Sequence, residues 1–313
     1  MPSPEPSSTR SYDFIGFGDE VPGILTLVSA AREFQRRTGR KPRTLILFKG
    51  SSANGVGGHL VRGGLSYLDR SRVPSDIRRT YNLPTFGEPS ALYQEFLQRS
   101  EVTQIALDPR KANRALRQML ESVGADILSG IAIDAVLKEG SAITGIKLTK
   151  GETYVGKQFV DSTVNAELAQ AAGIRKLPGF GTLGLPQSEL PVTLVFETEG
   201  LSIDRLRRIE YEYLRRFTNP NDAEAQGWLN IAAGGDPVLA DYLRRDLSDR
   251  FGNLKTMWIG ADYIDVRSKA LSIAYHAYRH KKLSLIESGI VFDNGNIALF
   301  PDGRMSWNAL LLY

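Results

Sequence analysis

Residues 13–48 place two short apolar segments on either side of a helical pattern, and this order constrains the fold more than any other part of the sequence. The segments DFIGF (13–17) and RTLILF (43–48) have the composition of buried strands. Between them, apolar residues recur on one face of a helix from Ile24 to Phe34. Two strands joined by a helix within roughly 35 residues form a βαβ unit, with parallel strands and a right-handed connection. The sequence therefore predicts an α/β fold.

The turn before this helix has the glycines of a nucleotide-binding turn, but not their usual spacing. Gly16, Gly18 and Gly23 are present, whereas Asp19 and Glu20 stand near the start of the helix. Phosphate binding there needs backbone N–H groups and a close backbone approach. If Gly18 is the first residue of the fingerprint, Glu20 and Gly23 take the second and third places. The other interpretation is that both acids only stabilise the helix N-terminus through its dipole.

The remainder of the chain reads as further α/β structure followed by a second domain. A helical pattern at 110–123 precedes several short strand-like segments that end at Asp161, and a Gly/Pro-rich stretch at 177–191 suggests a boundary. Residues 290–300 predict a hairpin that turns at Asn-Gly. We expect three regions: a disordered arm (1–11), a nucleotide-binding domain (12–180) and a mixed α+β substrate or cap domain (181–313).

Composition excludes several classes of chemistry and partner. The chain has no cysteine, which removes disulfides, thiolate metal sites and dithiol redox chemistry. His276 and His280 have helical spacing for a metal, but no third ligand is evident, so we expect no metal. The net charge of +4 is dispersed and predicts no nucleic-acid partner. No apolar run approaches the roughly 20 residues of a membrane span. We expect a cytoplasmic protein acting on a small molecule, of undetermined oligomeric state.

The glycine-dense segment GGHLVRGGLSYLD (57–69) is the most specific motif. It resembles the Gly-Gly-x-x-x-x-Gly-Gly-Leu-Ser-Tyr-x-Asp stretch of FAD-dependent oxidoreductases with a glutathione-reductase-type Rossmann domain. The segments YDFIGFGDEVPGI (12–24), ALDPRKANRALRQMLESVGADILSGIAIDAV (106–136) and FVDSTVNAELAQAAGI (159–174) resemble other stretches of that family in the same order. The resemblance implies a Rossmann-type FAD/NAD(P)-binding domain followed by a second, mixed α+β domain.

The resemblance also implies a cofactor, a reaction and a set of site residues. FAD would be the cofactor, and hydride transfer from a small organic substrate to the flavin would be the reaction. His59 and Tyr67 are the acid–base candidates near the flavin. The residues expected to contact the cofactor are Gly18, Glu20, Gly23, Gly57, Gly58, His59, Arg62, Gly63, Gly64, Ser66, Asp161 and Thr163.

Departures from the family pattern keep two other hypotheses open. No acid follows the strand at 43–48, Val164 replaces a glycine, and no late Gly-Asp segment occurs before Tyr313. Compared with the family pattern, we therefore expect either a shorter chain or a missing portion, with an incomplete domain at 181–313. The chain could therefore be a non-catalytic Rossmann-fold relative that has lost tight flavin binding and acts as a binding or interaction module. Alternatively, Lys49 could favour the 2′-phosphate of NADP.

Overall fold

The computed structural model describes residues 9–177, 179–185 and 190–313. These residues form two compact units, each treated separately below. The first unit lies within Met1–Gly64, Val73–Val102 and Asp108–Gln187, and the second within Leu65–Arg72, Thr103–Leu107 and Ser188–Tyr313. Two short segments between Leu65 and Leu107 thus belong to the second unit, although the sequence assigns them to the first domain.

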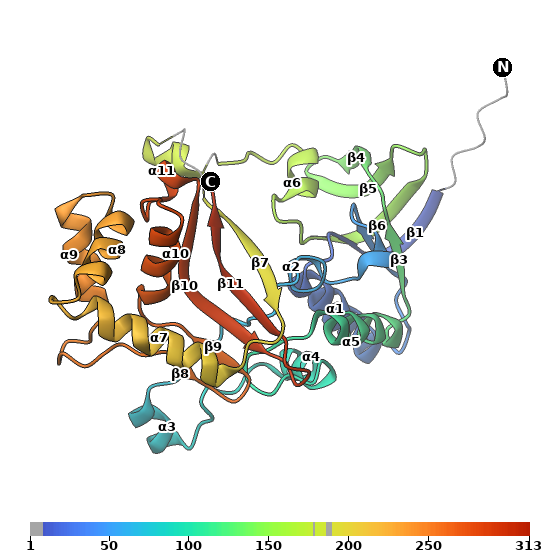
Figure 1. The fold of residues 1–313 in the computed structure, drawn as a ribbon. Helices are drawn as coiled ribbons and strands as arrows, with labels where there is room; N and C mark the ends of the chain where they lie inside the picture. The colour runs from blue at the N-terminus through green and yellow to red at the C-terminus, as the bar shows by residue number, and fades with distance from the viewer. Residues whose placement is uncertain (1–8, 178, 186–189) are drawn as a thin grey trace. The chain divides into compact units, whose positions relative to one another are not determined.

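The first unit contains a six-stranded sheet in the order β3-β2-β1-β6-β5-β4 (Figure 1). β1 pairs in parallel with β2 and β6, and β2 pairs in parallel with β3. β4, β5 and β6 form an antiparallel meander. The strands are β1 (Thr9–Phe17), β2 (Thr44–Phe48), β3 (Ala125–Ser129), β4 (Ile133–Glu139), β5 (Ala142–Leu148) and β6 (Thr153–Asp161).

Helices complete the first unit, with α1 packed against β1 and α5 against β3. The helices are α1 (Val21–Thr38), η1 (Ser52–Asn54), α2 (Gly58–Val61), α3 (Ser75–Tyr81), α4 (Ala91–Arg99), α5 (Pro109–Ser122), α6 (Glu167–Ala171) and η2 (Gly179–Leu183). Ile24, Leu27 and Val28 of α1 are fully buried, as their spacing predicts. The predicted βαβ unit and Rossmann-type fold are confirmed.

The second unit contains a five-stranded antiparallel sheet in the order β7-β11-β10-β9-β8. Its strands are β7 (Val192–Thr198), β8 (Trp258–Ile259), β9 (Tyr263–Asp265), β10 (Ile290–Leu299) and β11 (Met305–Leu312). Its helices are α7 (Ile203–Phe217), α8 (Ala223–Ala233), α9 (Pro237–Asp246), α10 (Ala270–Tyr278) and α11 (Leu285–Ser288). The mixed α+β character predicted for this part of the chain is confirmed.

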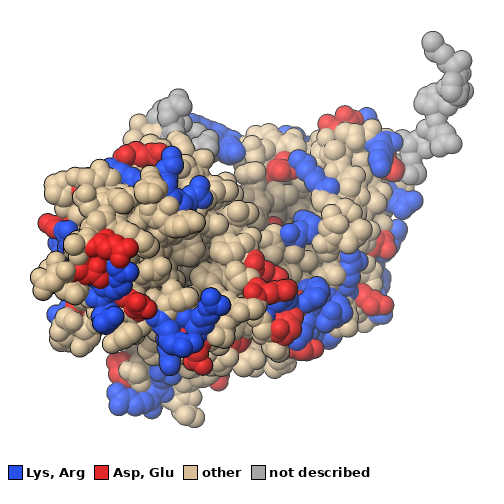
Figure 2. Space-filling view, viewed as in Figure 1, with Lys and Arg blue, Asp and Glu red and all other residues tan. Residues whose placement is uncertain are grey.

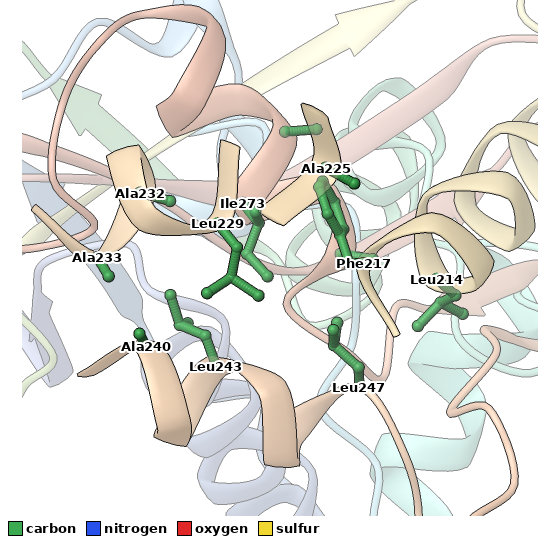
Figure 3. Packing of buried hydrophobic residues seen from close by; sticks show 12 residues of the cluster. Leu214, Phe217, Ala225, Leu229, Ala232, Ala233, Ala240, Leu243, Leu247 and Ile273 are labelled. Carbon is green, nitrogen blue, oxygen red and sulfur yellow. The ribbon is translucent and has the colours of Figure 1, made fainter. Parts of the chain in front are cut away.

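Two apolar clusters stabilise the second unit. In the first, side chains of α7 to α10 point toward one another, with Phe217, Leu229 and Leu243 almost fully buried (Figure 3). The second cluster lies on the sheet, where the Trp307 ring stacks on Phe196 with centroids 5.8 Å apart. Burying each such side chain contributes about 1.5–3 kcal/mol.

The prediction that a hairpin at 290–300 turns at Asn-Gly is wrong. Asn294-Gly295 lies inside β10, where the register shifts between Phe292 and Asn296, and the chain turns after Phe300 instead. Gly295 does not take positive φ, and its carbonyl accepts the Val266 N–H at 2.8 Å. The tight turn contains Gly303 at φ 85°, and the Phe300 N–H donates to the Arg304 carbonyl. Pairing of β10 with β9 outweighs the local preference of Asn-Gly for a turn.

Other expectations concern the chain's start, boundary and surface. β1 begins at Thr9, inside the expected arm, and residues 1–8 lie outside the described residues. The Gly/Pro-rich stretch at 177–191 includes residues 178 and 186–189, which also lie outside them. Figure 2 shows basic and acidic side chains interspersed on the visible face. Among the described helices, none is long and apolar enough to cross a bilayer.

Candidate functional site

A pocket of about 230 Å³ lies in the first unit beside the ends of β1, β2 and β6. Ligands of open α/β sheets bind at the carboxyl ends of parallel strands, so this is the expected place for a site. The pocket is lined by Gly18, Asp19, Glu20, Phe48, Lys49, Gly50, Arg62, Ser162, Thr163, Val164, Asn165 and Glu167.

The glycines of the β1–α1 turn bring the helix close to the exit of β6. Gly18 has φ 94°, and a Cβ there would lie 2.7 Å from the backbone of Ser162 and Thr163. A Cβ on Gly23 would lie 2.1 Å from Ser162 Oγ. Glu20 is the N-cap of α1, but its side chain makes no capping hydrogen bond. The glycines therefore serve chain packing, and the Glu20 carboxylate is directed elsewhere.

Asp19 is the buried centre of the site, with 4% of its surface exposed. Its Oδ2 accepts the N–H of Gly57 at 3.0 Å and that of Gly58 at 3.3 Å. Arg62 donates Nη2–H to Asp19 Oδ1 at 2.7 Å and Nη1–H to Oδ2. Burial by itself would raise the pKa of Asp19, but the Arg62 guanidinium and the two N–H groups together lower the pKa below its ordinary value. Asp19 is therefore ionised at neutral pH.

The Glu20 carboxylate binds the next residue of the same loop, His59. Its two carboxylate oxygens each lie 3.2 Å from the His59 backbone nitrogen, which donates its N–H to them, and His59 Nδ1 lies 2.8 Å from Oε1. Gly58 makes this approach possible, because a Cβ there would lie 2.0 Å from Glu20 Oε1. The carboxylates of Asp19 and Glu20 thus accept three consecutive backbone N–H groups of the loop, those of Gly57, Gly58 and His59.

The opposite side of the pocket is formed by the turn after β6. Asp161 accepts the N–H and hydroxyl of Thr163 at 2.9 and 2.7 Å, and its other oxygen accepts the Ala169 N–H at 3.0 Å. Lys49 Nζ lies 2.5 Å from a Glu167 carboxylate oxygen, which pairs the end of β2 with α6. Asp161 and Thr163 therefore organise the turn into α6.

The structure brings only part of the predicted contact set together. Gly18, Glu20, Arg62 and Thr163 line the pocket, and Gly57, Gly58 and His59 join it through the two carboxylates. Gly23 packs against Ser162, and Asp161 accepts hydrogen bonds from Thr163, so each contacts a lining residue of the pocket. Gly63 follows the C-cap of α2 and donates its N–H to the Gly58 carbonyl, and Gly64 comes next with φ 67°.

Ser66 and Tyr67 belong to the second unit and are not among the pocket-lining residues. The Ser66 carbonyl accepts the Leu107 N–H at 2.8 Å. The Tyr67 hydroxyl donates to Asp265 Oδ1, and Arg72 donates to Asp265 Oδ2 at 2.8 Å. Burial and the Asp265 carboxylate raise the pKa of Tyr67 far above its ordinary value. At neutral pH Tyr67 is a hydrogen-bond donor and not a base.

Sequence reasoning missed Asp19 and Glu167 as members of the site. Asp19 was visible in the turn, but nothing local indicates that it meets a loop 38 residues away. The one available signal was Arg62, a cation in the glycine-dense loop that needs an anionic partner. Chemically, three converging N–H groups and a guanidinium form an anion-binding arrangement, here satisfied by the chain's own carboxylates.

Comparison with known proteins gives a family match and distant fold neighbours. A family model described as FAD dependent oxidoreductase matches residues 42–285, which is more than half of the chain. The solved structures that it resembles include L-proline dehydrogenase from P. horikoshii, with a TM-score of 0.41, 13% identity and 63% of each chain covered. Another is pqsL, a probable FAD-dependent monooxygenase from Pseudomonas aeruginosa, with a TM-score of 0.37 and 14% identity over 62% of this chain and 52% of that one. The chain thus spans less than two thirds of either structure, and no curated protein matches it.

Proposed function

Because the chain belongs to the FAD dependent oxidoreductase family, we propose that it is a flavin enzyme that takes a hydride from a small organic substrate. FAD is the cofactor, as the family match establishes and as the resemblance of residues 57–69 implies. The glutathione-reductase-type subclass, the substrate and the direction of transfer belong to the proposal. The observation that carries it is the anion-binding arrangement at the loop 57–62, in the region that the family model matches.

The donor set fits a phosphate group of the cofactor. Gly57, Gly58 and His59 offer backbone N–H groups, and Arg62 offers a forked pair of donors, which suit phosphate as well as carboxylate. The absence of a side chain at Gly58 allows an anion to approach the backbone, whereas the absence of one at Gly57 allows close packing against Val61 and Leu116. The pocket of about 230 Å³ is below the roughly 300–1,000 Å³ of small-molecule sites, so entry of a dinucleotide requires the Glu20 side chain to move.

When bound, FAD supplies the hydride-accepting ring, while the protein provides position and electrostatics. The chain has no cysteine, so its own side chains offer no dithiol route. His59 has a largely exposed ring beside the Glu20 carboxylate and remains the acid–base candidate of the first unit. Tyr67 remains a candidate only as a proton or hydrogen-bond donor, because its raised pKa makes it a poor base.

The test is a visible absorption spectrum of the purified protein, repeated after incubation with FAD and again after denaturation. We expect a flavin band that shifts when denaturation releases the cofactor. A colourless protein that stays folded and gains no thermal stability from FAD would contradict the proposal. Stabilisation by NADP where FAD has no effect would instead favour a nicotinamide enzyme that uses Lys49.

A second function is favoured by one observation, the occupation of the loop N–H groups by Asp19 and Glu20. If no ligand displaces these carboxylates from the loop N–H groups, the chain is a non-catalytic Rossmann-fold relative that acts as a binding module. This alternative predicts that neither flavin nor nicotinamide cofactors alter thermal stability.

A further inference from the structure

We propose that Asp19 and Glu20 form an internal anion that competes with the cofactor's phosphate for the loop 57–62, and that Glu20 sets the affinity of this chain for FAD. The inference rests on the proposed function, because it concerns cofactor binding at the same site. Its evidence is the set of contacts within the first unit, and it assigns a role to two acidic residues in a turn that lies outside the matched range 42–285.

The competition follows from the number of donors and of acceptors. Asp19 accepts hydrogen bonds from the N–H groups of Gly57 and Gly58 and from Nη1 and Nη2 of Arg62, and Glu20 accepts the N–H of His59. An incoming phosphate needs the same kinds of donor, and it carries the same sign of charge as the carboxylates that hold them. It can gain these hydrogen bonds only as the carboxylates give them up.

The charges around the pocket are not equally compensated. Asp19 is paired with Arg62, and Glu167 with Lys49. Among the described residues, the Glu20 carboxylate forms its ion pair with His59, which is charged only when it is protonated, while the Arg62 guanidinium acts on it at longer range. Glu20 is therefore the pocket carboxylate without a direct ion pair to a lysine or arginine among the described residues, because Arg62 pairs with Asp19. Like charges placed opposite each other in a binding site weaken binding strongly.

Burial separates the roles of the two acids. Asp19 is almost completely buried and makes hydrogen bonds with both of its oxygens, so it holds the loop in shape. Glu20 has a side chain that is 25% exposed, and it meets the His59 N–H only at 3.2 Å. The Glu20 side chain can therefore swing toward solvent without disturbing the core. Glu20 is the displaceable member of the pair.

The experiment measures the dissociation constant of FAD for the wild-type chain and for Glu20→Gln, by quenching of flavin fluorescence. Glutamine keeps the size and an accepting oxygen while it removes the charge, so we expect roughly tenfold or greater tightening. The matched control is Glu95→Gln, which removes a carboxylate of nearly equal exposure, 26%, that pairs with Arg32 elsewhere in the same unit. The control should bind FAD as the wild type does. Glu20→Ala provides a second uncharged variant if the glutamine variant does not fold.

Each outcome decides the proposal. Tightening in the uncharged Glu20 variants alone supports it, and unchanged or weaker FAD binding in them overturns it. If neither the wild type nor any variant binds FAD, the proposed function fails, and inorganic pyrophosphate becomes the probe. A larger rise in Tm with pyrophosphate for Glu20→Gln than for the wild type then still supports the internal anion. An equal response, or none, overturns it.

Discussion

Arg62 donates hydrogen bonds to both carboxylate oxygens of Asp19, and this pair joins the β1–α1 turn to the glycine-dense loop 43 residues away. The Arg62 guanidinium also lies over the Phe48 ring, 5.2 Å from its centroid, at the end of β2. One arginine thus connects three segments around the candidate site. Its pairing explains why an acidic residue stands in a turn where a phosphate-binding protein would avoid one.

Replacing Asp19 with Asn should destabilise the first unit strongly. The change leaves the Arg62 charge without its partner beside a nearly buried position, and breaking such a pair costs about 3–5 kcal/mol, with the lower end expected because Arg62 is a quarter exposed. Urea unfolding of the cofactor-free protein measures the effect. Glu33→Gln is the control, since that exposed carboxylate pairs with Arg36 and Arg37 at the surface and its loss should leave the free energy of unfolding nearly unchanged. Equal losses for both variants would contradict a structural role for Asp19.

Asp13 should make the first unit sensitive to acid. Its buried carboxylate accepts two hydrogen bonds from Arg40 at 3.0 Å, one from Lys157 at 2.9 Å and one from the Arg43 N–H. The Arg40 hydrogen bonds, followed by those of Lys157 and Arg43, hold the pKa of Asp13 far below its ordinary value. A lowered folded-state pKa gives stability that is present above the unfolded pKa of about 4 and is lost as the pH falls toward the folded one. When the pH is lowered below 4, the urea concentration at the unfolding midpoint should therefore decrease more steeply for the wild type than for Asp13→Asn.

Glu210 should give the second unit the opposite pH dependence, with stability lost as the pH rises. Its side chain is 0% exposed, Oε2 accepts the Met257 N–H at 2.9 Å, and burial raises its pKa to about 7. A raised folded-state pKa gives stability that is present below the unfolded pKa and is lost as the pH rises through the folded one. The free energy of unfolding of the second unit should decrease by on the order of 2 kcal/mol between pH 4.5 and 7. Glu210→Gln should abolish this loss, as urea unfolding at pH 5 and 8 would show. A loss that persists in the variant would identify another group as its source.

Tyr67→Phe tests whether Tyr67 is structural or catalytic. The change removes the hydroxyl donor to Asp265, which keeps its hydrogen bond from Arg72, and it preserves the ring contact with Tyr263 at 6.1 Å. We expect a loss of about 1 kcal/mol in the free energy of unfolding. If Tyr67 is only structural, flavin content and turnover stay unchanged. A drop in kcat of more than tenfold at unchanged flavin content would assign it a role in the reaction.

Local features of the sequence were good predictors of the elements and of their order. The βαβ unit could be read from apolar periodicity, because each strand and helix buries a face that repeats within a few residues. Residues 57–69 indicated the family because glycines at close-approach positions leave a short, contiguous pattern. The Asn294-Gly295 turn failed because pairing of β10 with β9 is non-local and outweighed the local preference.

The sequence by itself determined the Rossmann-type sheet, the mixed second unit and the family, because these depend on periodicity and on short contiguous motifs. Only the tertiary structure decided what the two acids of the opening turn do. Their partners at Gly57, Gly58, His59 and Arg62 lie 38 or more residues away, and no local pattern records such a pairing. The same holds for Tyr67, whose partner Asp265 is 198 residues distant. Hydrogen bonds and ion pairs of this kind depend on where folding brings the chain, and so they became visible only in the folded molecule.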